Sequence, residues 1–359
     1  MKFSFLYVLI GVSLWWDFTE SACDDKFKVY PHHTACLPRA PNSSPGIVSS
    51  QEALAAHNKY RGMAVSKNGV QNMLKMVWDP EVAKIAQRWA ENCKTEHDGN
   101  RERFIPGRFT LGQNLAYNHF GSMTWDAVVK LWYDEEKDFV YGGNTNDYMK
   151  IGHYTQLVWA ESYVLGCGYS VCNGTHFYVC NYGPAGNSPS SRLGTPYEKH
   201  GAPCKSSDGN GLCECGTTIC EANAKKNHTT CECSCPGTNV YTGIKCELTC
   251  SGHQDPSYCV LSYTKDKCIR LSNVAFDCPV LCNVCPYAET SYKEGSTVPK
   301  CVKIGGCASN SNGSNGSGSS NTGSGSNGSG SNGNDGARLE SHNVLMFVTL
   351  LFTFFVAYN

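Results

Sequence analysis

Apolar residues recur at helical spacing in three segments between residues 48 and 192. After Asp79-Pro80, which is typical of a helix start, one face collects Val82, Ile85, Ala86, Trp89, Ala90 and Cys93. A helix is also predicted from Ser50 or Gln51 through Arg61, and another over 125–139, with Val128, Leu131 and Trp132 facing inward.

Two later segments alternate apolar and polar residues at a period of two. Residues 163–169 and 176–181 carry β-branched and aromatic side chains and are predicted as strands. Three helices around a small antiparallel sheet predict an α+β domain with three α/β/α layers over 48–192. An N-terminal extension, 22–47, precedes it.

The two ends of the chain have patterns of their own. Residues 1–21 combine Lys2 with an apolar run that is too short to span a bilayer, and Ser21 and Ala22 are small. This favours a cleaved secretory signal over a buried N-terminal helix.

Residues 309–336 are almost entirely Ser, Asn and Gly, a composition that predicts a disordered stalk. The following segment, 337–359, has a polar spacer and then an apolar tail, which indicates a GPI-attachment signal at Asn334 or Asp335. A short transmembrane anchor and a soluble, secreted form are the alternatives.

Composition supports an extracellular location. The chain has 359 residues, a net charge of −1 and 22 cysteines. The near-neutral charge does not favour a nucleic-acid partner, and dense cysteines indicate disulfides formed in an oxidising compartment. Sequons for N-glycosylation occur at six sites: Asn42, Asn173, Asn227, Asn312, Asn315 and Asn327.

The cysteines after residue 192 fall into blocks with even counts. Eight lie within 204–246, six within 250–285, and Cys301 and Cys307 remain for a short segment, 286–308. Their Cys-x-Cys and Cys-x-x-Cys spacings also suit metal or redox sites, but structural disulfides are the favoured interpretation in a secreted chain.

Two longer motifs connect the first domain to a known family. The segment 152–159 reads GHYTQLVW and 177–187 reads FYVCNYGPAGN, and His57-Asn58 with Arg61 matches a third, shorter pattern. Together they resemble the CAP superfamily of cysteine-rich secretory, venom allergen and pathogenesis-related proteins. The resemblance implies the same α/β/α sandwich, and disulfides pairing Cys93 with Cys172 and Cys167 with Cys180. We interpret His57 as structural, and Cys23 with Cys36 as an added N-terminal pair.

The cysteine blocks carry weaker resemblances. The end of 193–249 is similar to the last loop of an EGF-like module, with an irregular spacing before it. The 250–285 block, with Asp255 and its closing cysteine spacing, looks like a ShK-type toxin module.

The candidate chemistry lies in a central cleft implied by the family resemblance. In CAP proteins two His and two Glu converge there and can hold zinc or another divalent metal, and His97, Glu135 and His153 match three of these positions. Glu135 is also notable without the family, because it follows Val128 and Trp132 at apolar spacing. The fourth position is Gln113, which is neutral and cannot act as a general base. The alternative is a polar core cluster that binds nothing.

The favoured function is a binding protein tethered to the cell surface by a lipid anchor, with a cleft for a metal, a sterol or fatty acid, or a cell-surface protein. Ion-channel modulation through 250–285, where Lys265 and Lys267 lie near Tyr263, is an alternative, as is a solvated charge cluster there. A metal-dependent peptidase is the least favoured, because the sequence holds no other hydrolase motif and no clear base.

Overall fold

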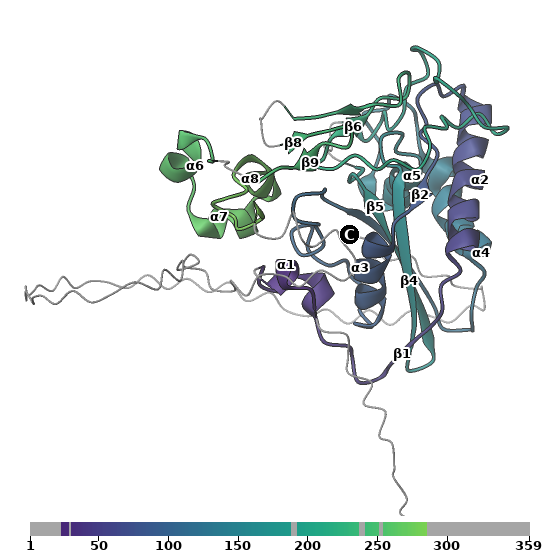
Figure 1. The fold of residues 1–359 in the computed structure, drawn as a ribbon. Helices are drawn as coiled ribbons and strands as arrows, with labels where there is room; N and C mark the ends of the chain where they lie inside the picture. The colour runs from purple at the N-terminus through teal and green to yellow at the C-terminus, as the bar shows by residue number, and fades with distance from the viewer. Residues whose placement is uncertain (1–22, 29, 188–191, 237–240, 251–253, 286–359) are drawn as a thin grey trace, which may run out of the picture. The chain divides into compact units, whose positions relative to one another are not determined.

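The computed structural model describes residues 23–28, 30–187, 192–236, 241–250 and 254–285. The predictions for the signal segment, the Cys301–Cys307 pair, the stalk, the tail and the GPI-attachment residues Asn334 and Asp335 lie outside the described residues. The α+β fold class is confirmed, with helices on both faces of a central sheet (Figure 1).

The central sheet has the strand order β1-β4-β5-β3, and β2 pairs in parallel with β4. Its other pairings are antiparallel, and β4 and β5 form a hairpin in which Cys167 lies opposite Cys180. The strands are β1 (Ser43–Pro45), β2 (Val77–Trp78), β3 (Gly112–Asn118), β4 (Val164–Cys172) and β5 (Thr175–Gly183).

Three helices cover one face of this sheet: α2 (Ser50–Asn68), α4 (Trp125–Tyr133) and α5 (Tyr148–Leu157). Their buried side chains form one core with Ala116, Tyr178 and Tyr182 of the sheet. Helix α3 (Pro80–Ala90) covers the opposite face, against Leu115 and Val179. Neighbouring strand residues thus contribute to different layers, as the alternation of a β-strand requires.

Two glycines let α3 lie directly on β4. A Cβ atom at Gly166 would come within 2.1 Å of the Ala83 nitrogen, and one at Gly168 within 2.2 Å of the Gln87 Cα. Because the obstructing atoms belong to the helix backbone, no side-chain rearrangement could make room. The end of the helix is then linked to the strand by the Cys93–Cys172 disulfide.

Three elements differ from the sequence predictions. Helix α2 continues seven residues beyond Arg61, to Asn68. The predicted 125–139 helix is α-helical only to Tyr133 and continues as a 3₁₀ turn, η2 (Asp134–Asp138). A fourth helix, α5, was not predicted at all, although it contains most of the GHYTQLVW motif.

The N-terminal extension forms α1 (Asp25–Lys28) and η1 (Thr34–Cys36), closed by the Cys23–Cys36 disulfide. The cysteine-rich region has short strand pairs, β6 (Lys225–Lys226) with β7 (Cys233–Ser234) and β8 (Tyr241–Thr242) with β9 (Glu247–Leu248). Short helices follow: α6 (Ser257–Ser262), α7 (Lys265–Arg270) and α8 (Ser272–Asp277).

Disulfides in the cysteine-rich region close within the two predicted blocks. Four lie in 204–246, namely Cys204–Cys213, Cys215–Cys231, Cys220–Cys233 and Cys235–Cys246. Three lie in 250–285, namely Cys250–Cys285, Cys259–Cys278 and Cys268–Cys282. Small modules with little core depend on such bonds for stability.

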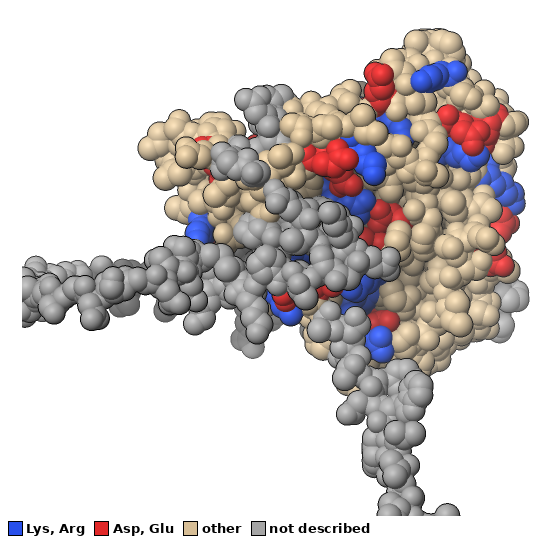
Figure 2. Space-filling model, in the orientation of Figure 1, with Lys and Arg blue, Asp and Glu red and all other residues tan. Residues whose placement is uncertain are grey.

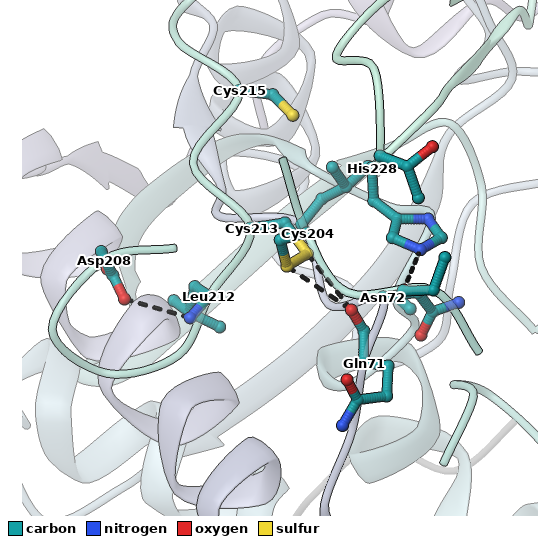
Figure 3. Close-up of a disulfide and its surroundings, with 12 residues drawn as sticks. Gln71, Asn72, Cys204, Asp208, Leu212, Cys213, Cys215 and His228 are labelled. Carbon is teal, nitrogen blue, oxygen red and sulfur yellow. Dashed lines mark hydrogen bonds between the residues drawn. A yellow bond between two sulfur atoms is a disulfide. The ribbon is translucent and has the colours of Figure 1, made fainter. Parts of the chain in front are cut away.

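The first of these disulfides lies against the sandwich. The carbonyl oxygen of Gln71 is 3.5 Å from the sulfurs of both Cys204 and Cys213 (Figure 3). Cys213 donates its N–H to Met73 and accepts one from Lys75, at 2.8 and 3.0 Å. The cysteine-rich region therefore pairs a short segment with residues 73–75, just before β2.

Surface charge agrees with the near-neutral sequence. On the face shown in Figure 2, acidic and basic side chains lie close to one another rather than in a large patch of one sign.

No helix among the described residues is both long and apolar enough to cross a bilayer.

Candidate functional site

The sandwich contains a cavity of about 590 Å³ at the start of β3. His97, Gln113, Gln156 and Asn187 line it, together with residues of the loop 98–111, which we call the wall loop. Gln113 is in β3, Gln156 is in α5, and Asn187 follows β5. Segments far apart in the sequence therefore meet at this cleft.

The two predicted residues on one side of the cleft are joined by a hydrogen bond. His97 donates from Nδ1 to Oε1 of Gln113, at 2.7 Å. The Gln113 amide in turn donates from Nε2 to Oδ1 of Asn181, at 3.1 Å. Asn181 is fully buried opposite Gln113 in the β3–β5 pairing. This chain of contacts orients the imidazole and leaves the Nε2 of His97 with its lone pair.

The environment keeps His97 neutral. Burial, followed by the nearby positive charge of Arg103, lowers the pKa of the imidazole to about 3, and the hydrogen bond to Gln113 opposes the shift only in part. A neutral carboxamide cannot stabilise an imidazolium as a carboxylate would. His97 therefore stays unprotonated at physiological pH, which is the form that binds metals.

His153 has the carboxylate partner that His97 lacks. Its Nδ1 donates to Oε1 of Glu135 at 2.6 Å. The other carboxylate oxygen accepts the backbone N–H groups of His153 and Tyr154, at 2.9 and 3.0 Å. Glu135 thus connects η2 to α5, and its hydrogen bonds explain how an acidic side chain is accommodated at an apolar position.

The predicted ligands do not meet as one compact set. Within the described part of the chain, one group of three His, Cys, Asp or Glu side chains brings its ligand atoms within 4.8 Å of one another: His57, Cys167 and Cys180. That group does not fit a metal. The two sulfurs form a disulfide, whereas the thiolate is the ligand, and both nitrogens of His57 are hydrogen-bonded.

His57 has the structural role that the sequence suggested. Its Nδ1 donates to the Ala53 carbonyl at 2.7 Å, and its Nε2 accepts from the Tyr182 hydroxyl at 2.9 Å. Burial lowers its pKa to about 4.

The disulfides implied by the family resemblance, Cys93–Cys172 and Cys167–Cys180, are both present. The sequon asparagines Asn42, Asn173 and Asn227 are exposed.

The wall loop is fixed from both sides. On one side, Asp98 accepts hydrogen bonds from Arg103 at 2.6 Å and from Thr34 of the N-terminal extension at 2.5 Å. On the other, Arg108 forms ion pairs with Asp79, Glu81 and Glu221, at 2.7, 2.6 and 2.8 Å. The extension and the cysteine-rich region therefore both position one side of the cleft.

Sequence reasoning missed three carboxamides around the cleft. The Nε2 of Gln156, the Nδ2 of Asn181 and the Oδ1 of Asn187 are buried without a hydrogen-bond partner among the described residues. All three residues lie inside the two long motifs, so the signal that could have identified them was present. A carboxamide carries no charge, so its presence in a sequence does not indicate a catalytic residue.

A family model and two relatives of known sequence indicate one family. Residues 54–182 match the model of the cysteine-rich secretory protein family, CAP. Cysteine-rich venom protein Mr30 of Conus marmoreus is 34% identical over 282 residues, covering 74% of this chain and 91% of that protein. Cysteine-rich secretory protein 3 of Homo sapiens is 41% identical over 174 residues, covering 46% and 68%. A crystal structure of NaASP2 with Zn²⁺ is 30% identical and covers 47% of this chain and 100% of that chain, with a TM-score of 0.37.

Proposed function

This chain belongs to the cysteine-rich secretory protein family, and we propose that it is an extracellular binding protein whose central cleft binds a divalent transition metal such as zinc. The disulfides throughout the described region support an extracellular location, since such bonds persist in oxidising compartments. The proposed ligands are His97, which lines the cavity, and His153, which is not among the lining residues.

The observation that carries this proposal is the matched support of the two imidazoles. Each donates its Nδ1 proton to a side-chain oxygen, His97 to Gln113 and His153 to Glu135. Histidines that bind metals usually donate the other ring N–H in this way, which fixes the tautomer and the ring orientation. Neutral imidazole nitrogen is a preferred ligand of zinc. In this arrangement Gln113 and Glu135 orient ligands rather than bind the metal themselves.

The peptidase alternative has less support. A hydrolytic metal site needs a base near the metal-bound water. Gln113 is neutral, and Glu135 uses both oxygens in hydrogen bonds to His153 and Tyr154. A binding role therefore suits these side chains better than a catalytic one.

Zinc titration by calorimetry on the full chain, produced in a eukaryotic secretory host, tests the proposal. Saturable binding is expected, and His97→Ala should weaken it by at least about tenfold. His119→Ala is the matched control, because His119 is exposed and contacts Thr175 outside the cleft. Zinc that binds only after Gln113→Glu would contradict the proposal and show that the glutamine has inactivated the site.

One observation favours a second function, ion-channel modulation by the 250–285 block. Val260 and Leu261 in α6 are 76% and 83% exposed, and Lys265 begins the next helix. An apolar pair near a basic residue suits contact with a membrane protein. The effect of the purified chain on potassium currents tests this, and no change with Leu261→Asp relative to wild type would count against it.

Tethering and lipid binding extend the binding role. A lipid anchor would hold the protein at the cell surface, and release by phosphatidylinositol-specific phospholipase C would test it. A sterol, a fatty acid or a cell-surface protein would be a further ligand, to be tested by direct binding of the labelled compound or protein.

A further inference from the structure

The Gln156 side chain occupies an unusual place on the cleft wall. It lines the cavity, yet the residue is only 1% exposed, and its Nε2 has no hydrogen-bond partner among the residues that the structure describes. A buried amide donor without a partner costs about 1–3 kcal/mol. A bound ligand or water can satisfy such a group, so the side chain indicates that the cleft accommodates a polar molecule.

Two glycines hold this carboxamide in position. A Cβ atom at Gly112 would lie 2.1 Å from Oε1 of Gln156, and one at Gly186 would lie 2.4 Å from Nε2. The amide plane therefore fits between two backbones that have room for it only because both residues lack side chains. Its position is fixed by packing rather than by hydrogen bonds, and its buried Nε2 is left without a partner among the described residues.

Asn187 supplies the complementary group beside it. The residue follows Gly186 directly, and its Nδ2 donates to the Gly152 carbonyl at 2.8 Å. Its Oδ1 is buried without a partner in the described ranges, and the residue also lines the cavity. A donor on Gln156 and an acceptor on Asn187 together match a group that carries one C=O and one N–H, which is a secondary amide.

The rest of the cleft favours a neutral, polar ligand. The charged residues lining the cavity are Asp98 and Arg103, and they neutralise each other in an ion pair of 2.6 Å. Few lining side chains are apolar, so there is little to receive the side chains of a peptide. Tyr148, 38% exposed, lines the same cavity.

We propose that the cleft binds an N-acetylated hexosamine, with the acetamido group between Gln156 and Asn187. This inference rests on the proposed role of the cleft as a binding site, and it names a class of ligand that the metal proposal does not require. The cavity volume of about 590 Å³ lies in the range of small-molecule sites.

Chitotriose and cellotriose provide the test, because they differ in having an acetamido group or a hydroxyl at each sugar's second carbon. Calorimetry and saturation-transfer NMR on the full chain should show binding of chitotriose at least about tenfold tighter than that of cellotriose. Gln156→Met removes the amide at similar volume and should weaken chitotriose binding by about tenfold or more. Gln71→Met is the matched control, since Gln71 lies away from the cavity lining.

Equal binding of the two sugars, no saturable binding up to roughly 10 mM, or an unchanged affinity in Gln156→Met would overturn the proposal. So would binding of a blocked oligoalanine peptide in place of chitotriose. If Gln156→Met fails to fold, the comparison of the two sugars on the wild-type chain still decides. Zinc binding that persists while chitotriose fails would reject the sugar proposal and leave the metal proposal intact.

Discussion

At the residue scale, the side chains around much of the cleft are carboxamides rather than carboxylates. Gln113 accepts from His97 and donates to Asn181, so one neutral side chain both orients the imidazole and links it to the fully buried strand residue behind it. A glutamate in its place could accept from His97 but could not donate to the Oδ1 of Asn181. The glutamine therefore supplies a donor to Asn181 that a carboxylate lacks.

The buried His57 gives a prediction for pH dependence. Its pKa is about 4 in the folded protein and near 6.5 when exposed by unfolding. Between these values the unfolded chain binds more protons, so the free energy of unfolding should fall as pH drops from 6.5 to about 4. A shift of this size corresponds to roughly 3 kcal/mol.

Denaturant unfolding at several pH values, compared between wild type and His57→Gln, measures this contribution. The variant should lose less stability than wild type across the same interval. His200→Gln is the control, because that side chain is exposed in the folded protein. Parallel curves for wild type and His57→Gln would show that His57 does not contribute the expected dependence.

At the scale of elements, the contact of α3 with β4 depends on the absence of a side chain. Gly168→Ala would place a Cβ against the Gln87 backbone and should lower the free energy of unfolding by about 1–3 kcal/mol. Gly209→Ala provides a matched control, since a Cβ atom there would have no neighbour within 4 Å in the described structure. Thermal unfolding of both variants checks the difference, and equal melting temperatures would contradict the close contact.

Elements with local signals were predictable. Asp79 caps α3 through the N–H groups of Glu81 and Val82, and Pro80 follows it, so the start of the helix is encoded in adjacent residues. Helix α5 also begins after an aspartate cap, Asp147, but its later turns have no such signal. Ile151 and every residue from His153 to Leu157 are buried, so no polar face marks its helical period.

The sequence predicts the residues of the site but not how they pair. His97, Gln113, Glu135 and His153 could be proposed from the family motifs, but their pairing depends on tertiary structure. Glu135 contacts α5 because the chain tightens into η2 after Tyr133, a change of helix type that apolar spacing does not reveal. Gly112 is in β3 and Gly186 follows β5, so the sequence alone does not show that both pack against Gln156.

At the scale of the whole molecule, Arg108 joins the sandwich to the cysteine-rich region through Glu221. Arg108→Ala would leave three carboxylates, on Asp79, Glu81 and Glu221, without this partner. Removing one member of a buried ion pair costs about 3–5 kcal/mol. Hydrogen exchange should therefore become faster in residues 220–236 and in the wall loop.

Lys130→Ala is the comparison for that variant. Its ion pair with Asp134 is exposed, so its loss should change stability by less than about 1 kcal/mol. If exchange in the wall loop responds equally to both variants, Arg108 does not couple the two regions.

The wall loop also suggests how the ligand preference of the cleft could differ between related proteins. One side of the cleft belongs to the sheet, where Gln113 and Asn181 pair across strands, while the other is held by Thr34 and Glu221, which lie outside the sandwich. Exchanging either flanking segment between relatives would reshape the binding surface. Ligand preference in such a protein is therefore a property of the assembled chain, and an isolated sandwich domain would report it incompletely.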